Sequence, residues 1–360
     1  MRLGIIGLPN SGKTTIFNAL TGGEAATGAV SSGQFEVHTA VVNVPDHRVD
    51  ALRDLYQPKK ATYATVTYTD IAGLDKGIGE GGLKGQFRQE LAQVDGFVHV
   101  VRVFADDTVP HPYGNIDPQR DVDLLDGEFL LADLVTVENR LEKLEDEIRV
   151  KGKRVDKIIH DEKALMERFE VHLESETPLR DLDDLTVDET KWARGFGFFT
   201  LKPLLLVLNL GDAVPDLADL LTYDHRQARV VGLQGKLEAE LSQLDAEDAA
   251  LFMEEYGITE LSAAKVIRLS YELMAIQSFF TVGEDEVRAW SIPSGAKAPE
   301  AAGAIHSDLQ KGFIRAEVMT YDDLMRAGSE AGVKAAGKLR LEGKDYVVQE
   351  GEIVHIRFNV

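Results

Sequence analysis

The sequence predicts an α/β protein built on a mostly parallel β-sheet, with a helical insertion and a small C-terminal α+β region. Short apolar segments alternate with helix-like segments in the first part of the chain, which is the pattern of parallel strands connected by helices. The candidate strands are Arg2–Ile6, Thr39–Val44, Thr65–Asp70, Phe97–Val103, Pro203–Leu208 and Arg229–Leu233. Most are apolar along their whole length, as expected for strands that helices cover on both faces.

The segment from about Glu128 to Leu201 has a different periodicity. Its first apolar residues are spaced alternately by four and three, which is the seam of a coiled coil; they are Leu130, Leu134, Val137, Leu141, Leu144 and Ile148. A second run contains Val155, Ile158, Leu165 and Phe169. Lys151-Gly152-Lys153 separates the two runs, and a glycine costs a helix interior about 1 kcal/mol. We therefore predict an antiparallel helical hairpin, with one long helix as the alternative, and a further helix over Val187–Phe198.

The C-terminal region reads as short strands mixed with a few helical turns. Residues 341–360 are predicted to be hairpin strands with turns at 342–345 and 349–352. The predicted domains are therefore a nucleotide-binding domain formed by 1–127 and 201–277, a coiled-coil insert at 128–200, and a β-rich domain at 278–360.

The composition limits the possible chemistry and location. The chain has 360 residues, a formal net charge of −22 and no cysteine, so disulfides, thiolate metal sites and cysteine nucleophiles are excluded. No stretch is long enough to cross a bilayer, and the apolar run after Arg2 is too short for a signal peptide. The acidity favours solubility and repels nucleic acid at long range. We expect a cytoplasmic monomer with no membrane partner.

The strongest motif is a phosphate-binding loop near the N-terminus. Residues 7–14 read Gly-Leu-Pro-Asn-Ser-Gly-Lys-Thr and match G-x-x-x-x-G-K-[ST] at every fixed position, between a predicted strand and a helix. Backbone N–H groups and the helix N-terminus would surround the phosphates. Lys13 would act as a catalytic cation on the β- and γ-phosphates, and Thr14 would ligate Mg²⁺. The expected nucleotide-binding residues here are Asn10, Ser11, Gly12, Lys13, Thr14 and Thr15.

A second acidic motif follows the third predicted strand. In Asp70-Ile71-Ala72-Gly73 the carboxylate suits Mg²⁺ and the Gly73 N–H suits the γ-phosphate. The glycines that follow, between 77 and 85, are expected to form a loop that γ-phosphate contacts order and hydrolysis releases. A plain flexible loop is the alternative.

The residue that orients water in Ras-like proteins is a glutamine, and Leu74 stands at that position here. Leucine has no polar group that can position water, so another residue must approach or hydrolysis must be slow. His111, in the loop after Phe97–Val103, is the candidate, with a surface histidine of no special role as the alternative.

Base recognition is predicted at Asn209-Leu210-Gly211-Asp212, after the strand Pro203–Leu208. This segment resembles N-K-x-D without its lysine. Asp212 can accept two hydrogen bonds from guanine, while Leu210 could cover a base face. A turn at the end of a strand is the alternative reading.

These motifs together resemble the YchF, or Obg-like ATPase, family of P-loop proteins over nearly the whole chain. The most specific segments are Lys311–Val318 and Arg340–Tyr346 near the C-terminus. The resemblance implies a G domain, a coiled-coil insert and a β-grasp TGS domain. It also implies ATP preference, Mg²⁺ dependence and association with ribosomes. The family's hydrophobic residue in place of the catalytic glutamine matches Leu74, and its loop histidine matches His111.

The sequence departs from the family pattern at three places. Asp212 replaces the usual glutamate of the base motif, and Gln34 falls where a Mg²⁺-associated threonine is usual, with Thr39 out of register. The stretch Gly232–Gly235 replaces the small residues of the second base-side loop. ATP or GTP therefore stays open as the nucleotide. A non-hydrolysing binding module stays open as well, whereas the absence of an evident arginine-bearing lid disfavours a small-molecule kinase.

The main cationic cluster is predicted at the tip of the helical hairpin and consists of Arg149, Lys151, Lys153, Arg154 and Lys157. Despite the net charge, such a patch could contact rRNA phosphates. We expect the ribosome to bind through this insert and the TGS-like domain, with a solvated helix end as the alternative.

Overall fold

The computed structural model describes residues 1–23, 37–71, 83, 85–152, 156–244, 246–255 and 261–359. The predictions for Gln34, Gly73, Leu74, Lys153 and Arg154, and for the glycines between 77 and 82, lie outside these ranges. By its contacts the chain forms two compact units, one made of 1–40 and 67–266 and the other of 41–66 and 267–360.

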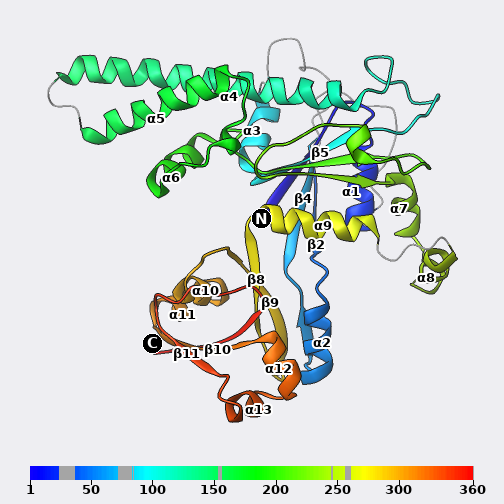
Figure 1. Cartoon of the computed structure of the whole chain (residues 1–360), viewed down its shortest axis with the longest axis vertical. Helices are drawn as coiled ribbons and strands as arrows, with labels where there is room; N and C mark the ends of the chain where they lie inside the picture. The colour runs from blue at the N-terminus through cyan, green and yellow to red at the C-terminus, as the bar shows by residue number, and fades with distance from the viewer. Residues whose placement is uncertain are drawn as a thin grey trace. The chain divides into compact units, whose positions relative to one another are not determined.

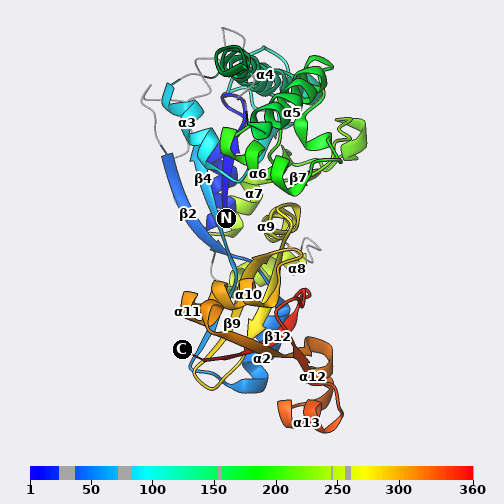
Figure 2. The same ribbon diagram turned by 90° about the vertical axis from the view of Figure 1, so that its left-hand side faces the viewer.

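The first unit contains the predicted parallel sheet (Figures 1 and 2). Its strands are β1 (Arg2–Ile6), β5 (Gly96–Arg102), β6 (Leu204–Asn209), β7 (Ala228–Leu233) and parts of β2 (Val37–Asn43) and β4 (Thr65–Ile71). The strand order is β2-β4-β1-β5-β6-β7, and β4, β1, β5, β6 and β7 pair in parallel. All six strand predictions are confirmed, with ends shifted by no more than two residues. β5 and β6 are buried along their whole length, whereas β2 is mostly exposed.

Helices connect these strands and cover the sheet. They are α1 (Lys13–Thr21), α3 (Gly85–Gln93), α4 (Pro118–Lys151), α5 (Lys157–Glu174), α6 (Val187–Phe196), α7 (Gly235–Leu241), α8 (Ala246–Glu255) and the start of α9 (Ser262–Leu273), with 3₁₀ turns η3 (Leu179–Asp181) and η4 (Leu217–Asp219). Among the described residues, none of the helices combines the length and apolar composition that a bilayer-crossing segment needs.

The predicted helical hairpin is present (Figure 1), as α4 and α5 lie side by side. α4 ends at Lys151, and Gly152 follows with a φ of +53°. A buried apolar seam joins the helices, formed by Val137, Leu141, Leu144, Leu165, Met166 and Phe169. However, α4 begins at Pro118, before the predicted start of the insert at residue 128. Its first turns belong to the core of the first unit, because Val122 and Leu125 pack against the sheet.

The second unit has its own sheet. Its elements are α2 (His47–Tyr56), β3 (Lys60–Thr62), β8 (Ile276–Thr281), β9 (Glu286–Pro293), α10 (Ala298–Ile305), α11 (Ser307–Lys311), β10 (Phe313–Thr320), α12 (Tyr321–Ala327), α13 (Glu330–Ala335), β11 (Arg340–Glu342) and β12 (Glu352–Phe358). The strand order is β11-β10-β12-β8-β9-β3. Residues 41–66, placed by the sequence in the nucleotide-binding domain, contribute to this unit because β3 pairs in parallel with β9.

The prediction of a terminal hairpin within 341–360 is wrong. β11 and β12 do not pair with each other; each pairs antiparallel with β10, one on either side. Turn-forming residues between two strands do not determine whether these strands pair with each other. Pairing also depends on residues far away in the sequence, and here β10 lies between β11 and β12.

An aromatic cluster joins the sheet of the first unit to the base of the helical insert. The ring centroids of Phe97 and Phe129 are 5.1 Å apart, and those of Phe129 and Phe199 are 5.3 Å apart. All three side chains are buried, and burying one phenylalanine side chain contributes about 1.5–3 kcal/mol. The cluster therefore anchors α4 to β5.

Asp133 fixes the same junction by polar contacts. Its Oδ1 accepts from the Phe199 N–H at 2.9 Å, and its Oδ2 accepts from the N–H and the hydroxyl of Thr200, both at 2.7 Å. Burial raises the pKa of Asp133 to about 6, while these donors act against the rise by stabilising the carboxylate. The buried carboxylate is thus held by three hydrogen-bond donors.

Replacing Asp133 with asparagine should destabilise the fold. The amide NH₂ would face the donors of Thr200, leaving buried hydrogen-bonding groups unsatisfied, so we expect Asp133→Asn to lower the free energy of unfolding by about 2–3 kcal/mol at pH 7. Denaturant unfolding measures this change. Glu138→Gln, at an exposed position of the same helix, is the matched control and should change stability by less than about 0.5 kcal/mol. Equal effects of the two substitutions would contradict the structural role of Asp133.

Candidate functional site

The phosphate-loop motif connects β1 to α1 and has the backbone that its glycines permit. Asn10 and Gly12 have positive φ angles of 61° and 92°, and α1 begins directly after Gly12. A Cβ at Gly12 would lie 2.2 Å from Nδ2 of Asn209, and one at Gly7 would lie 2.3 Å from the Val100 carbonyl oxygen. Both positions therefore require glycine. The loop that results can turn its N–H groups toward an anion at the helix N-terminus.

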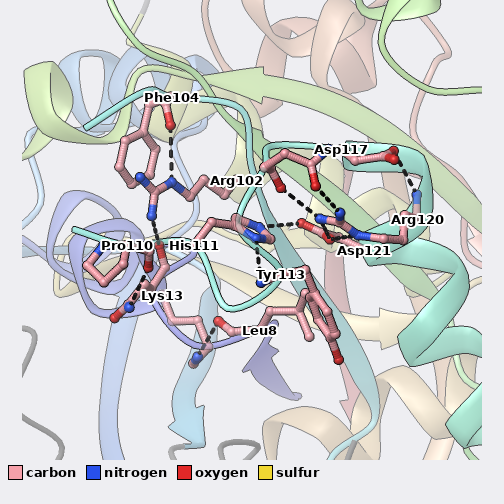
Figure 3. Close-up of polar contacts among 12 residues, drawn as sticks. Leu8, Lys13, Arg102, Phe104, Pro110, His111, Tyr113, Asp117, Arg120 and Asp121 are labelled. Carbon is pink, nitrogen blue, oxygen red and sulfur yellow. Dashed lines mark hydrogen bonds and ion pairs between the residues drawn. The ribbon is translucent and has the colours of Figure 1, made fainter. Parts of the chain in front are cut away.

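Lys13 spans this loop. Its ammonium donates to the carbonyl oxygens of Gly7 and Leu8, each at 3.0 Å, and Figure 3 shows the side chain reaching toward Leu8. Ser11 is buried within the loop, and Thr15 follows Thr14 in the first turn of α1. The motif thus places the positive charge of the Lys13 ammonium beside the turn that contains Asn10 and Gly12.

Thr14 and Asp70, the two residues predicted to hold Mg²⁺, lie in contact. The Thr14 hydroxyl donates to Oδ2 of Asp70 at 3.0 Å, because β4 lies next to β1 and Asp70 is in register with Ile5. Within the described residues, Oδ1 of Asp70 is buried without a hydrogen-bond partner. Burial raises the pKa of Asp70, whereas the Thr14 hydroxyl and the Lys13 charge lower it. Hard oxygen ligands with an unused lone pair fit Mg²⁺.

Asn209 links the phosphate loop to the second base-side loop. Its Nδ2 donates to the Ser11 carbonyl at 3.0 Å, and its Oδ1 accepts from the Gly235 N–H at 3.2 Å. A Cβ at Gly235 would lie 2.7 Å from that oxygen. Asn209 is only 3 % exposed, so it ties the phosphate loop to the loop before α7, and its contact with a nucleotide stays a prediction.

Two other residues of the base motif differ in their placement. Leu210 is buried in the core, where a Cβ at Gly232 would lie 2.8 Å from its Cδ1. The side chain packs against Gly232 and Leu217, and that it covers a base face stays a prediction. Asp212, in contrast, is exposed and accessible to a ligand.

Gln234 stabilises the base motif in a way that the sequence did not predict. Its Nε2 donates to the carbonyl oxygens of Gly211 and Asp212 at 2.9 and 3.2 Å. These loops line a cavity of about 270 Å³ whose walls include Leu210, Gly232 and Gln234. The glutamine was visible in the sequence only as a departure from a small residue, and its contact partners depend on the tertiary fold.

His111 is not a surface residue. Its side chain is 4 % exposed, and its Nε2 lies 2.9 Å from Oδ2 of Asp121, at the start of α4. The Tyr113 N–H donates to its Nδ1 at 3.1 Å. Figure 3 shows the imidazole turned toward Asp121. The structure thus brings His111 into a buried polar cluster with Asp121 rather than into contact with Lys13 or Thr14.

Arg102 and His99, both on β5, are further buried polar residues near the loop that motif analysis missed. Arg102 donates to the carbonyl oxygens of Phe104, Asp106 and Asn10, at 3.1, 3.3 and 3.5 Å, and burial lowers its pKa. Burial, and to a lesser degree the Lys13 charge, lowers the pKa of His99 to about 3. His99 is therefore neutral near pH 7. The only sign of these two residues in the sequence is that each is a polar residue within an apolar strand.

Two protein-family models match the chain. Residues 2–139 match a model described as a 50S ribosome-binding GTPase. Residues 276–359 match a model of the YchF-GTPase C-terminal region, described as a protein of unknown function.

Curated relatives and a solved structure match over nearly the full length. "Ribosome-binding ATPase YchF" of Bacillus subtilis is 40 % identical over 99 % of both chains, and the protein of the same name from Pasteurella multocida is 41 % identical over 100 % of this chain and 99 % of its own. "Obg-like ATPase 1" of Gallus gallus is 36 % identical over 100 % of this chain and 92 % of its own. The structure of the Schizosaccharomyces pombe YchF GTPase superposes with a TM-score of 0.85 at 32 % identity, covering 99 % of this chain and 97 % of that one. With these matches, and with the phosphate loop, Asp70 and Asn209 arranged around one site, the chain belongs to the YchF family.

Proposed function

We propose that the chain is a Mg²⁺-dependent hydrolase that prefers ATP and works as a ribosome-associated switch in the cytoplasm. The names "Ribosome-binding ATPase YchF" and "Obg-like ATPase 1" of its relatives support both the nucleotide and the partner. A GTP hydrolase with the same site and a binding module without hydrolysis are the competing functions.

The phosphate loop is the observation that carries the proposal. A triphosphate would meet the N-terminus of α1, the ammonium of Lys13 and the hydroxyl of Thr14 together. Phosphate oxygens are charged acceptors and form stronger hydrogen bonds with an ammonium than neutral carbonyls do. Lys13 would therefore exchange its bonds to Gly7 and Leu8 for bonds to the phosphates.

Hydrolysis would then follow the usual phosphoryl-transfer scheme. In-line attack by water forms a bond to the γ-phosphorus and breaks its bond to the bridging oxygen, and Lys13 with the loop N–H groups stabilises the charge on the γ-oxygens. When bound, Mg²⁺ would neutralise charge on the β- and γ-phosphates, with Thr14 and Asp70 as its protein partners. No cluster of three or more metal-binding side chains occurs among the described residues, so phosphate and water oxygens would supply the other ligands. His111 would assist the attacking water, since Leu74 has no group to orient it.

The hairpin tip supports the proposed contact with ribosomal RNA only through its exposed cations. Arg149 pairs with Asp146 at 2.6 Å, and Lys151 pairs with Glu147, whereas Lys157 is exposed at the start of α5. Exposed ion pairs contribute at most about 1 kcal/mol, so RNA phosphates can replace these partners. We further propose a TGS-like β-grasp domain at 278–360, an insert at 128–200 and a G domain at 1–127 and 201–277, of which 41–66 packs in the second unit.

Lys13→Ala should weaken binding of a non-hydrolysable ATP analogue by about 10- to 100-fold, because a charge-assisted contact of about 1.5–3 kcal/mol is lost. Isothermal titration measures the dissociation constant. Lys143→Ala, at an exposed position of α4, is the control and should bind like the wild type. If Lys13→Ala binds with unchanged affinity, the loop is not the triphosphate site.

ATP and GTP analogues should differ in affinity, with ATP bound more tightly. In the ATP-preferring protein that we propose, Asp212 does not read guanine. Asp212→Ala should therefore change the dissociation constant of the ATP analogue by less than about threefold, since an exposed side chain makes a small contribution. Parallel titrations of both analogues with both proteins measure this. Tighter GTP binding that Asp212→Ala abolishes would instead support the GTP hydrolase.

Ribosome binding should weaken with salt, since each released phosphate counterion adds to the slope of log K against log [salt]. The double variant Arg149→Gln/Lys151→Gln should lower the magnitude of that slope by about 1–2 if both cations contact phosphate. Co-sedimentation with ribosomes at 50–200 mM salt tests this, with Lys143→Gln as control. A salt-independent affinity would exclude the hairpin tip as an RNA-binding site.

A further inference from the structure

The start of α4 holds His111 in a chain of buried polar contacts (Figure 3). Oδ2 of Asp121 faces the imidazole, and Oδ1 accepts from Nε and Nη2 of Arg120 at 3.0 and 2.7 Å. Arg120 is itself held by the side chain and the carbonyl of Asn115, at 2.8 and 2.9 Å. The Asp121 side chain is only 3 % exposed. The carboxylate is therefore fixed from both sides, and it presents one oxygen to the histidine.

These contacts determine the tautomer of His111. The Tyr113 N–H can only donate, so Nδ1 must be the acceptor and carry no proton. An ionised carboxylate can only accept, so Nε2 must carry the proton and donate it to Asp121. Both ring nitrogens are occupied. In this state the imidazole has no lone pair available to accept a hydrogen bond or a proton from water.

The loop that carries His111 is also attached to the phosphate loop, through Pro110, the residue before the histidine. Nδ2 of Asn10 donates to the Pro110 carbonyl at 3.0 Å. Arg102 reaches both loops, through the carbonyl oxygens of Asn10 and Asp106. A change in the backbone around Asn10 would therefore be transmitted to the segment that carries His111.

We propose that Asp121 is a positioning residue that stores His111 in an inactive state, and that His111 assists hydrolysis only after leaving Asp121. This inference rests on the proposed function, in which His111 acts on the attacking water. Asp121 does not belong to the phosphate loop, the metal site or the base motif. Its effect on the rate is exerted through the histidine alone.

Single-turnover ATP hydrolysis tests the proposal with Asp121→Ala, Asp121→Asn, His111→Ala and the double variant Asp121→Ala/His111→Ala. We expect Asp121→Ala to raise the rate by up to about tenfold, because a hydrogen bond to a charged partner no longer holds the histidine. Asp121→Asn should give a smaller increase, since its carbonyl can still accept from Nε2. The double variant should be as slow as His111→Ala. Because nucleotide binding works against the contact between His111 and Asp121, the dissociation constant for an ATP analogue should rise in none of them and should fall by up to about tenfold in those that break this contact.

Asp123→Asn, at an exposed position of the same helix, is the matched control and should leave the rate unchanged. An Asp121→Ala rate at or below the wild-type value, together with a slow His111→Ala, overturns the storage role and leaves the proposed function intact. If His111→Ala hydrolyses ATP at the wild-type rate, the role of His111 in the proposed function fails, and the inference fails with it.

A measurement on the wild-type chain covers the case in which the Asp121 variants do not fold. In ¹⁵N-histidine-labelled, nucleotide-free protein, His111 should show a protonated Nε2 and an unprotonated Nδ1, with the signals assigned by their loss in His111→Gln. Adding Mg²⁺ and a non-hydrolysable ATP analogue should shift both ring-nitrogen signals in part, because only a fraction of the His111 side chains leaves Asp121 in the wild-type complex. An unchanged pattern in the saturated complex would overturn the proposal.

Discussion

The approach of the Gly12 backbone to the Asn209 side chain is the constraint on which the site depends. No side chain fits at Gly12, since its Cβ would lie 2.2 Å from the Asn209 amide. That amide bonds to the Ser11 carbonyl on one side and to the Gly235 N–H on the other. Asn209 ends β6 and Gly12 precedes α1, and only β5 lies between β1 and β6 in the sheet. The sheet order therefore determines the shape of the phosphate loop and its distance from the base-side loops.

The site also concentrates buried polar atoms that lack partners within the described part of the chain. They include Oδ1 of Asp70, Oγ of Ser11 and both ring nitrogens of His99. Each such atom costs about 1–3 kcal/mol when it is left unsatisfied. The buried structural carboxylate of Asp133, in contrast, accepts from three donors on its two oxygens. The carboxylate of Asp133 has hydrogen-bond donors on both oxygens, whereas that of Asp70 has a donor on only one among the described residues. This difference indicates that the site around Asp70 is organised to bind a ligand.

The parts that could be predicted from the sequence are those encoded locally. The strands followed from short apolar runs, the phosphate loop from a motif in its strand–helix context, and the hairpin turn from Gly152 between two apolar seams. The features that could not be predicted depend on the tertiary fold. The position of β10 between β11 and β12, the inward packing of Leu210 against Gly232, and the burial of His111 by Asp121 depend on tertiary neighbours that periodicity does not encode. The same reason explains why Gln234 and Arg102 were missed.

The free energies involved suggest how the two loops respond to a nucleotide. The His111 segment is held to the phosphate loop by the neutral bond from Asn10 to Pro110, and such a bond contributes a net of about 0.5–1.5 kcal/mol. The contact of His111 with the Asp121 carboxylate is charge-assisted and contributes about 1.5–3 kcal/mol. A triphosphate offers several charge-assisted bonds to Lys13 and to the loop N–H groups, and each is of the same order as the contact between His111 and Asp121. A ligand that binds differently to the two arrangements can therefore shift the equilibrium between them, and Asn10, with its left-handed backbone inside the phosphate loop, is the residue through which the difference would be exerted.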